Sequence, residues 1–170
     1  MIILSIGSNL RSKYGDRFNN LRCAISFLKD YEISIIKESS IYETPAYPDA
    51  NDPKFLNIII SIESNLSPQD LMKALLEIED KFERKRIKKN DPRTCDIDII
   101  DYNGEIINFT YKDQNLTIPH NKLSSRNFVL YPLSEILPYW KHPKTKVNIS
   151  DLIDQLPGKD RKSILKIKKN

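Results

Sequence analysis

Residues 91–100 read DPRTCDIDII, with an arginine three residues before the first of two aspartates that stand two residues apart. In an extended strand the side chains alternate between the two faces, so Asp96 and Asp98 are predicted to project together. The apolar side chains are predicted to project to the other face: Cys95, Ile97 and Ile99. Two neighbouring carboxylates repel each other, and Mg²⁺, which binds one or two carboxylates together with substrate phosphates, relieves the repulsion. The stretch therefore predicts a metal and phosphate site that Arg93 also faces.

A basic run, ERKRIKKNDPR at residues 83–93, leads into this strand. Arginine binds phosphate oxygens through a planar fork, which favours Arg84, Arg86 and Arg93 over the flexible lysines as phosphate ligands. The four glycines form no GxGxxG or GxxxxGK[ST] loop, so a bound nucleotide would be held by side chains and metal. The alternative interpretation is a strand whose two acidic residues simply face water.

The composition predicts one globular domain over residues 1–170, long enough to bury about 70 % of its unfolded surface. Two cysteines, no leader-like N-terminus and no apolar run near the ~20 residues of a membrane span favour a cytoplasmic protein. A net charge of +4, from 27 basic and 23 acidic residues, is too mild to require a nucleic-acid partner. We expect a monomer, with a solvated or frayed basic tail at residues 159–170.

Hydrophobic periodicity predicts four strands and two helices in the order βαββαβ. The expected elements lie at residues 2–8, 16–28, 33–42, 56–63, 67–82 and 94–102. Asp16 and Ser67 are the expected N-caps. Such a chain folds economically as an α+β, ferredoxin-like antiparallel sheet with both helices packed on one face.

Three further features complete this expected fold. Residues 43–54 carry three prolines and are predicted to form a binding loop. Asn103-Gly104 is typical of a hairpin turn. Short helices near residues 127–137 and 150–156 are expected to form a C-terminal extension beside the sheet.

Six segments, in order, resemble the 6-hydroxymethyl-7,8-dihydropterin pyrophosphokinase family, which belongs to the folate pathway. They are SIGSNL (5–10), YETP (42–45), FLN (55–57), PRTCDIDI (92–99), IPH (118–120) and RNFVLYPLSEI (126–136). Each is short, but six in order across residues 3–138 are highly specific. The resemblance implies a Mg²⁺-dependent transferase that moves the terminal diphosphate of ATP to a pterin alcohol and releases AMP.

The resemblance also implies roles for individual residues. Asp96 and Asp98 would hold two Mg²⁺ ions, and Arg84 and Arg93 would be mobile catalytic arginines. The implied ATP contacts are Arg84, Arg86, Arg93, Ile99, His120 and Arg126. The implied pterin contacts are Thr44, Pro45, Tyr47, Phe55, Asn57 and Phe128.

These roles agree with physical chemistry. A flat heterocycle stacks well between aromatic rings, as Phe55 and Phe128 would provide, and a buried amide such as Asn57 rejects ligands that leave it unpaired. Considered alone, the two phenylalanines fit an ordinary core equally well, and His120 fits a surface histidine.

The chain departs from the family pattern at three positions. Asp91 stands where glycine or alanine is usual, Asn90 where some members have tryptophan, and Asn121 where an aromatic residue follows the histidine. The loop between Arg84 and Arg93 is also slightly short. These differences bear on loop closure and ATP affinity and not on the reaction class.

Three other functional classes compete with this interpretation. The βαββαβ order is shared with RNA-binding RRM modules, but the aromatic RNP1 pattern is absent from the sequence. A nucleotidyltransferase would place its Gly-Ser about a dozen residues before its DxD, whereas about ninety separate Gly7-Ser8 from Asp96 here. A phosphatase would place the DxD after an N-terminal strand.

Overall fold

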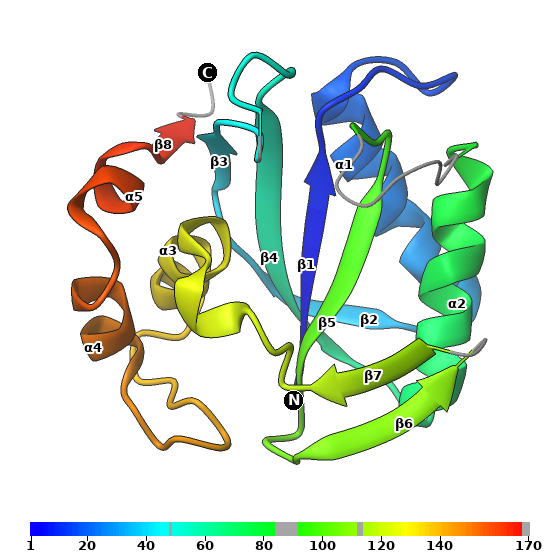
Figure 1. Cartoon of the computed structure of the whole chain (residues 1–170). Helices are drawn as coiled ribbons and strands as arrows, with labels where there is room; N and C mark the ends of the chain where they lie inside the picture. The colour runs from blue at the N-terminus through cyan, green and yellow to red at the C-terminus, as the bar shows by residue number, and fades with distance from the viewer. Residues whose placement is uncertain (48, 84–91, 112–113, 168–170) are drawn as a thin grey trace.

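The computed structural model describes all of residues 1–170 except 48, 84–91, 112–113 and 168–170. The fold is α+β, with a mainly antiparallel sheet and several helices (Figure 1). The main strands and helices are β1 (Ile2–Ser8), α1 (Arg17–Phe27), β2 (Ser34–Glu38), β3 (Ile41–Thr44), β4 (Phe55–Glu63), α2 (Pro68–Lys81) and β5 (Asp96–Tyr102). After them come β6 (Ile107–Tyr111), β7 (Gln114–Ile118), α3 (Asn127–Ile136), α4 (Ile149–Asp154), α5 (Gly158–Lys162) and β8 (Leu165–Ile167). Short 3-10 turns lie at Leu28–Tyr31 and Leu123–Ser125.

The central sheet has the strand order β5-β1-β4-β3-β8, and β2 also pairs with β4. Strand β1 is antiparallel to both neighbours, β4 and β5, and lies at the middle of the molecule. β6 and β7 form a separate two-stranded ribbon. Helices α1 and α2 cover one face of the sheet, and α3 with α4 lies on the other (Figure 1).

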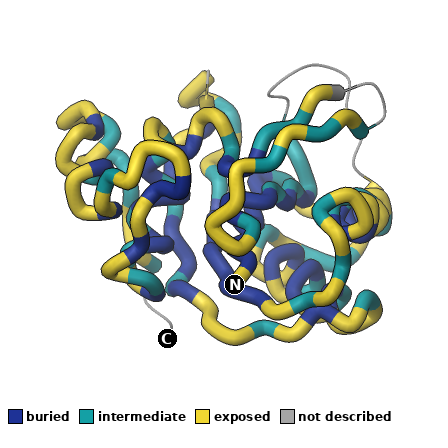
Figure 2. The backbone as a smooth tube through the Cα atoms, turned by 90° about the horizontal axis from the view of Figure 1, so that it is seen from below, coloured by how far each residue is buried: buried dark blue, intermediate teal, exposed yellow. Residues whose placement is uncertain are grey.

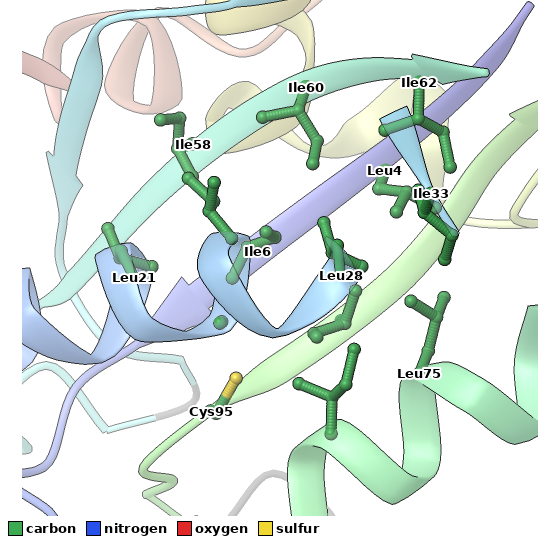
Figure 3. Packing of buried hydrophobic residues seen from close by; sticks show 14 of the residues in the cluster. Leu4, Ile6, Leu21, Leu28, Ile33, Ile58, Ile60, Ile62, Leu75 and Cys95 are labelled. Carbon is green, nitrogen blue, oxygen red and sulfur yellow. The ribbon is translucent and has the colours of Figure 1, made fainter. Parts of the chain in front are cut away.

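The alternation of side chains along β1 divides the core into two clusters. Ile2, Leu4 and Ile6 face α1 and α2, whereas Ile3 faces α3. Figure 3 shows the first cluster, in which the β1 side chains meet Leu21 of α1 and leucines and isoleucines of neighbouring elements. Burying one such aliphatic side chain contributes about 1.5–3 kcal/mol, so this packing is the main force that fixes the sheet against its helices. In Figure 2 the buried residues, drawn in dark blue, lie toward the middle of the molecule, and the exposed residues, drawn in yellow, lie mostly around it.

Both predicted helix N-caps are confirmed. The Asp16 side chain accepts a hydrogen bond from the Asn19 N–H at 2.9 Å, and the Ser67 hydroxyl accepts one from the Asp70 N–H at 3.1 Å. Pro68 occupies the first turn of α2, where its missing N–H removes no helical hydrogen bond. Local sequence therefore determines where both helices begin.

The prediction of one strand over residues 33–42 is wrong, because the segment forms β2 and β3 with a break at Ser39. The buried Ser39 hydroxyl accepts a hydrogen bond from the Ile59 N–H at 3.0 Å and so replaces a backbone acceptor in the ladder. A register shift between Ile35 and Lys37 adds to the irregularity. A side chain that competes with the ladder in this way leaves no trace in the hydrophobic pattern.

The turn at Asn103-Gly104 is confirmed, since both residues have positive φ, 55° and 73°. The prediction that this turn joins two strands paired as a hairpin is wrong. Within the described residues, β6 pairs with β7 and not with β5. The turn therefore directs the chain away from the central sheet.

The expectation of a frayed tail also needs correction. Residues 158–162 form α5, and β8 joins the edge of the sheet, with Ile167 opposite Ile41. The backbone of β8 pairs with β3, and Ile167 packs against the apolar cluster on the α1 and α2 face, whereas Leu165 is 60 % exposed. No helix in the described part of the chain is both long and apolar enough to span a membrane.

The Glu135 carboxylate joins α3 to the sheet edge. It accepts hydrogen bonds from the Ser40 hydroxyl at 2.8 Å and the Tyr42 hydroxyl at 2.9 Å, and pairs with Lys166 at 3.2 Å. Burial raises the pKa of Glu135, but these hydrogen bonds lower it more, so the pKa lies below its ordinary value. A carboxyl whose pKa is lowered by folding stabilises the protein above its unfolded pKa, and this contribution is lost as the pH falls.

We therefore predict that Glu135→Gln lowers the free energy of unfolding by about 1 kcal/mol at pH 7, because charge-assisted hydrogen bonds are lost. The difference from wild type should shrink as the pH falls below about 4.5, the range in which an unfolded glutamate titrates. Urea unfolding at pH 3.5 and pH 7 measures this, with exposed Glu63→Gln as control. A difference that stayed constant with pH would contradict the role given to the Glu135 charge.

Candidate active site

A polar row crosses the sheet on the face that α3 partly covers. In the register of β1, Gly7 lies opposite Asn57 of β4 on one side and opposite Asp96 of β5 on the other. Ser5 lies opposite Asp98 in the next row of the same face. Residues directly opposite in paired strands share a face, so Asn57, Asp96 and Asp98 project together. The prediction of a shared face for the two aspartates is confirmed.

The residues that alternate with the two aspartates project into the apolar core on the other face of the sheet, as expected. Cys95, Ile97 and Ile99 all belong to the cluster formed with α1 and α2. Ile99 is 3 % exposed on this opposite face, so its side chain does not face Asp98. The expected ATP contact of Ile99 therefore remains a prediction for its backbone alone.

Each aspartate is paired with an arginine, Asp96 with one three residues before it and Asp98 with one from the start of α3. The Arg93 guanidinium lies 2.6 Å from an Asp96 carboxylate oxygen, and the Arg126 guanidinium lies 3.1 Å from one of Asp98. Burial raises the pKa of the Asp98 carboxyl, and the Asp96 charge raises it further, while His120 and Arg126 act in the opposite direction. The site thus holds two interacting carboxylates, each with the positive charge of an arginine beside it.

This donor set fits Mg²⁺. Within the described residues there is no group of three or more histidine, cysteine or acidic side chains arranged around one point. Mg²⁺ does not require such a cage, because it keeps several waters and commonly binds one or two carboxylates plus substrate phosphates. The charge of Asp96 raises the pKa of Asp98, so a cation bound next to both carboxylates would relieve their repulsion.

The Asn57 amide is buried, at 3 % exposure, and the central strand β1 separates it from the two carboxylates. Its Nδ2 donates a hydrogen bond to the Thr44 hydroxyl at 3.2 Å. Gly7 leaves room for the amide, since a Cβ on Gly7 would lie 3.1 Å from Asn57 Oδ1 and 3.8 Å from the Phe55 ring. Thr44 therefore holds the Asn57 amide in place, and Gly7 leaves the space that the amide occupies.

The two aromatic residues assigned to a pterin sandwich begin β4 and α3. Phe55 and Phe128 are both half-buried, and each lies near one of the site arginines. The Arg93 guanidinium carbon is 5.7 Å from the centre of the Phe55 ring, and that of Arg126 is 5.4 Å from the centre of the Phe128 ring. Each arginine therefore contacts one aspartate and one aromatic ring, which brings the expected metal and pterin groups into one site.

His120 stands close enough to the aspartates to interact with them electrostatically. Burial lowers the pKa of His120 below its ordinary value, and Arg126 also lowers it, while Asp98 and Asp96 act in the opposite direction. The ring is therefore neutral at pH 7. Its Nδ1 accepts a hydrogen bond from the Lys122 N–H at 3.0 Å, which leaves the proton on Nε2 as a donor for a ligand oxygen.

The remaining residues predicted to contact the pterin or ATP differ in their burial, and some lie outside the described residues. Thr44 is buried next to Asn57, whereas Pro45 and Tyr47 are exposed, Tyr47 at 77 %. Arg84 and Arg86, and the departures at Asn90 and Asp91, lie outside the described residues.

Sequence reasoning missed one asparagine that connects the two sides of the site. The buried Asn9 side chain accepts a hydrogen bond from the Arg93 N–H at 2.7 Å and donates one to the Pro53 carbonyl at 2.9 Å. It thus links the proline-rich loop to the arginine segment. Asn9 lies inside the SIGSNL motif, but the motif does not indicate that its side chain links these two segments.

A buried carboxylate beneath β5 was missed as well. Glu79 of α2 accepts a hydrogen bond from the Ile97 N–H at 2.7 Å, at the residue between the two aspartates. A charged residue at an otherwise apolar helical position, four residues after Leu75, was the available signal. Glu79 therefore helps to fix the backbone from which Asp96 and Asp98 project.

Comparison with known proteins agrees with this arrangement. A family model described as 7,8-dihydro-6-hydroxymethylpterin-pyrophosphokinase (HPPK) matches residues 3–138. A 2-amino-4-hydroxy-6-hydroxymethyldihydropteridine pyrophosphokinase of Synechocystis is 36% identical over 155 residues, covering 91% of this chain and 75% of that protein. A protein with the same description from Aquifex aeolicus is 36% identical over 142 residues, covering 84% of this chain and 83% of the relative.

Longer relatives contain the same region. The folic acid synthesis protein fol1 of Schizosaccharomyces pombe is 36% identical over 156 residues, and the chain covers 20% of its length. The chain thus spans about a fifth of this relative. Among solved structures, the Plasmodium falciparum HPPK-DHPS wild type with pteroate superposes with a TM-score of 0.73 and 16% identity, over 91% of this chain and 44% of that one. At this identity the likeness shows the fold alone.

The space at Gly7 provides a direct test of the site. We predict that Gly7→Ala weakens binding of the pterin alcohol about tenfold, because the new methyl group displaces the Asn57 amide, while a nonhydrolysable ATP analogue binds nearly as in wild type. Calorimetry with each ligand measures this. Gly158→Ala is the matched control, since nothing lies within 4 Å of its added Cβ. Unchanged pterin affinity in Gly7→Ala would exclude this face of β1 as the pterin site.

Proposed function

The chain belongs to the 7,8-dihydro-6-hydroxymethylpterin-pyrophosphokinase family, and we propose that it acts as an ATP-dependent pyrophosphokinase in folate biosynthesis. It would transfer diphosphate from ATP to 6-hydroxymethyl-7,8-dihydropterin, giving AMP and the pterin diphosphate. The observation that carries this proposal is the row in which Gly7 separates the buried Asn57 amide from Asp96. A group for the heterocycle and groups for the phosphates thus share one face of the sheet.

Substrate binding would change the partners of the site arginines. Asp96 and Asp98 would hold two Mg²⁺ ions, which when bound supply positive charge for the triphosphate. With the carboxylates so engaged, Arg93 and Arg126 would be released from their ion pairs to bind phosphate oxygens. The neutral His120 would donate its Nε2 proton to the same anion. Arg84 and Arg86 are proposed as further phosphate contacts from the resemblance alone.

The pterin would stack between Phe55 and Phe128, with its polar edge on Asn57 and on the residues from Thr44 to Tyr47. Its hydroxymethyl oxygen would attack the β-phosphorus of ATP. The bond from that phosphorus to the oxygen shared with the α-phosphate breaks, the oxygen leaves with AMP, and the alcohol proton passes to water. Arg93 would stabilise the charge that develops on the leaving oxygen.

We also propose that the arrangement of strands and helices is ferredoxin-like. The order β5-β1-β4-β3, with α1 and α2 on one face, supports a ferredoxin-like arrangement over one domain of residues 1–170. A cytoplasmic, monomeric state without a nucleic-acid partner stays a prediction. An RNA-binding module is less favoured, because the polar end of the sheet face carries two carboxylates where an RRM presents aromatic rings.

The reaction is tested by its products. Phosphorus NMR of the enzyme with ATP, Mg²⁺ and the pterin alcohol should show AMP and pterin diphosphate in equal amounts. ADP or free phosphate as the main product would mean transfer or hydrolysis at the γ-phosphorus and would exclude the proposed reaction.

The metal assignment is tested separately. We predict that Asp96→Asn and Asp98→Asn each lower turnover at saturating Mg²⁺ by at least about a thousandfold, because several kcal/mol of charge stabilisation are lost. Circular dichroism should show an intact fold, since removing one of two repelling charges does not weaken the core. Asp80→Asn, an exposed acid on α2, is the control. Near wild-type turnover in either site variant would contradict the assignment.

A further inference from the structure

The C-terminal residues 158–167, here called the strap, form α5 and β8 and lie beyond the residues that the family model matches. We propose that the strap, through Asn127, positions Phe128 for pterin binding, an inference that rests on the proposed function. In Figure 1 the strap runs beside α3 and then joins the edge of the sheet at β3. It therefore touches both elements that border the candidate pterin site.

The first contact is at the start of α3. Asn127 is 9 % exposed, and its Nδ2 donates hydrogen bonds to the Asp160 carbonyl at 2.6 Å and to the Ser163 hydroxyl at 3.1 Å. The Ser163 hydroxyl in turn donates to the Asp160 carbonyl at 3.1 Å. Both amide hydrogens are thus used to hold the end of α5. The first turn of α3 is anchored to the strap and not only to the sheet.

Asn127 lies between two site residues in the sequence. Arg126 precedes it and pairs with Asp98, while Phe128 follows it. Successive helical residues are turned by about 100°, so a helix can fix one side chain on the strap while its neighbours face the site. Arg126 has its own anchor in Asp98 and contacts the Phe128 ring, while the helix start that Asn127 holds sets the backbone from which that ring projects.

The second contact is at the opposite side of the site. In β8, Leu165 lies opposite Glu43, directly before Thr44. Thr44 in turn lies opposite Phe55 and accepts the Asn57 hydrogen bond. The strap therefore connects the Phe55 side of the pterin site to the Phe128 side. Its two attachments determine how far apart the two aromatic rings stand.

The test replaces Asn127 with aspartate, which has the same shape but cannot donate to the Asp160 carbonyl. We expect Asn127→Asp to raise the KM for the pterin alcohol about tenfold, while kcat and the KM for ATP change by less than about threefold. Asn127→Ala should behave in the same way. Ser163→Ala, which removes one of the two acceptors, should give a smaller rise. Calorimetry of pterin binding, measured under conditions without turnover, should show the same loss of affinity.

Leu28→Ala is the control for general destabilisation, because Leu28 is fully buried in the cluster on the opposite face of the sheet from α3. At a temperature where all variants are folded, it should leave the KM for the pterin unchanged. A rise in Leu28→Ala equal to that in Asn127→Asp, or a wild-type pterin KM in both Asn127 variants, would overturn the inference. If Asn127→Asp does not fold, Asn127→Ala and Ser163→Ala decide by the same criteria.

The wild-type enzyme distinguishes the two proposals. If it forms no AMP and no pterin diphosphate, the proposed function fails and the strap inference fails with it. If it forms both products while the pterin KM of the Asn127 variants stays at the wild-type value, only the strap inference is wrong.

Discussion

The two ion pairs on β5, Arg93 with Asp96 and Arg126 with Asp98, are the interactions on which the site depends. They balance two carboxylates that would otherwise repel each other, and they bring in arginines from the segment before β5 and from the start of α3. The same two arginines lie beside the rings proposed to hold the pterin. A change of partner, from carboxylate to phosphate, would therefore alter the metal, ATP and pterin sides of the site together.

The sheet makes this arrangement possible by giving its two faces different tasks. One face is closed by α1 and α2 over an apolar core, which fixes the strands rigidly. The other is covered by α3 and α4 around Ile3 and Ile59, while Asp96 and Asp98 on the same face remain partly exposed. Elements from distant parts of the chain then support the polar row at Gly7 from its edges, including Asn9, Glu79 and Asn127. A rigid apolar layer thus carries a polar face whose side chains are held mainly by hydrogen bonds.

Local physical chemistry predicted the strand that carries Asp96 and Asp98, the shared face of these residues, and both helix caps. Those features depend on alternation and on side chains three residues apart, which a sequence displays directly. The break at Ser39, the strand β8 and the support from Asn9 and Asn127 depend on contacts between residues far apart in the chain, which periodicity does not reveal. The grouping of Phe55 with Phe128 was implied only by resemblance to the family, since either residue alone fits an ordinary core.

The central claim is that the face of the sheet around Gly7 brings the pterin hydroxymethyl group beside the phosphates held at Asp96 and Asp98. The most direct measurement is paramagnetic relaxation of a ¹³C-labelled hydroxymethyl carbon in the complex of enzyme, Mn²⁺, nonhydrolysable ATP analogue and pterin alcohol. The account predicts strong relaxation in wild type and its loss in Asp98→Asn under conditions where the pterin still binds. Bound pterin whose hydroxymethyl carbon showed no Mn²⁺-dependent relaxation in the wild-type complex would contradict it.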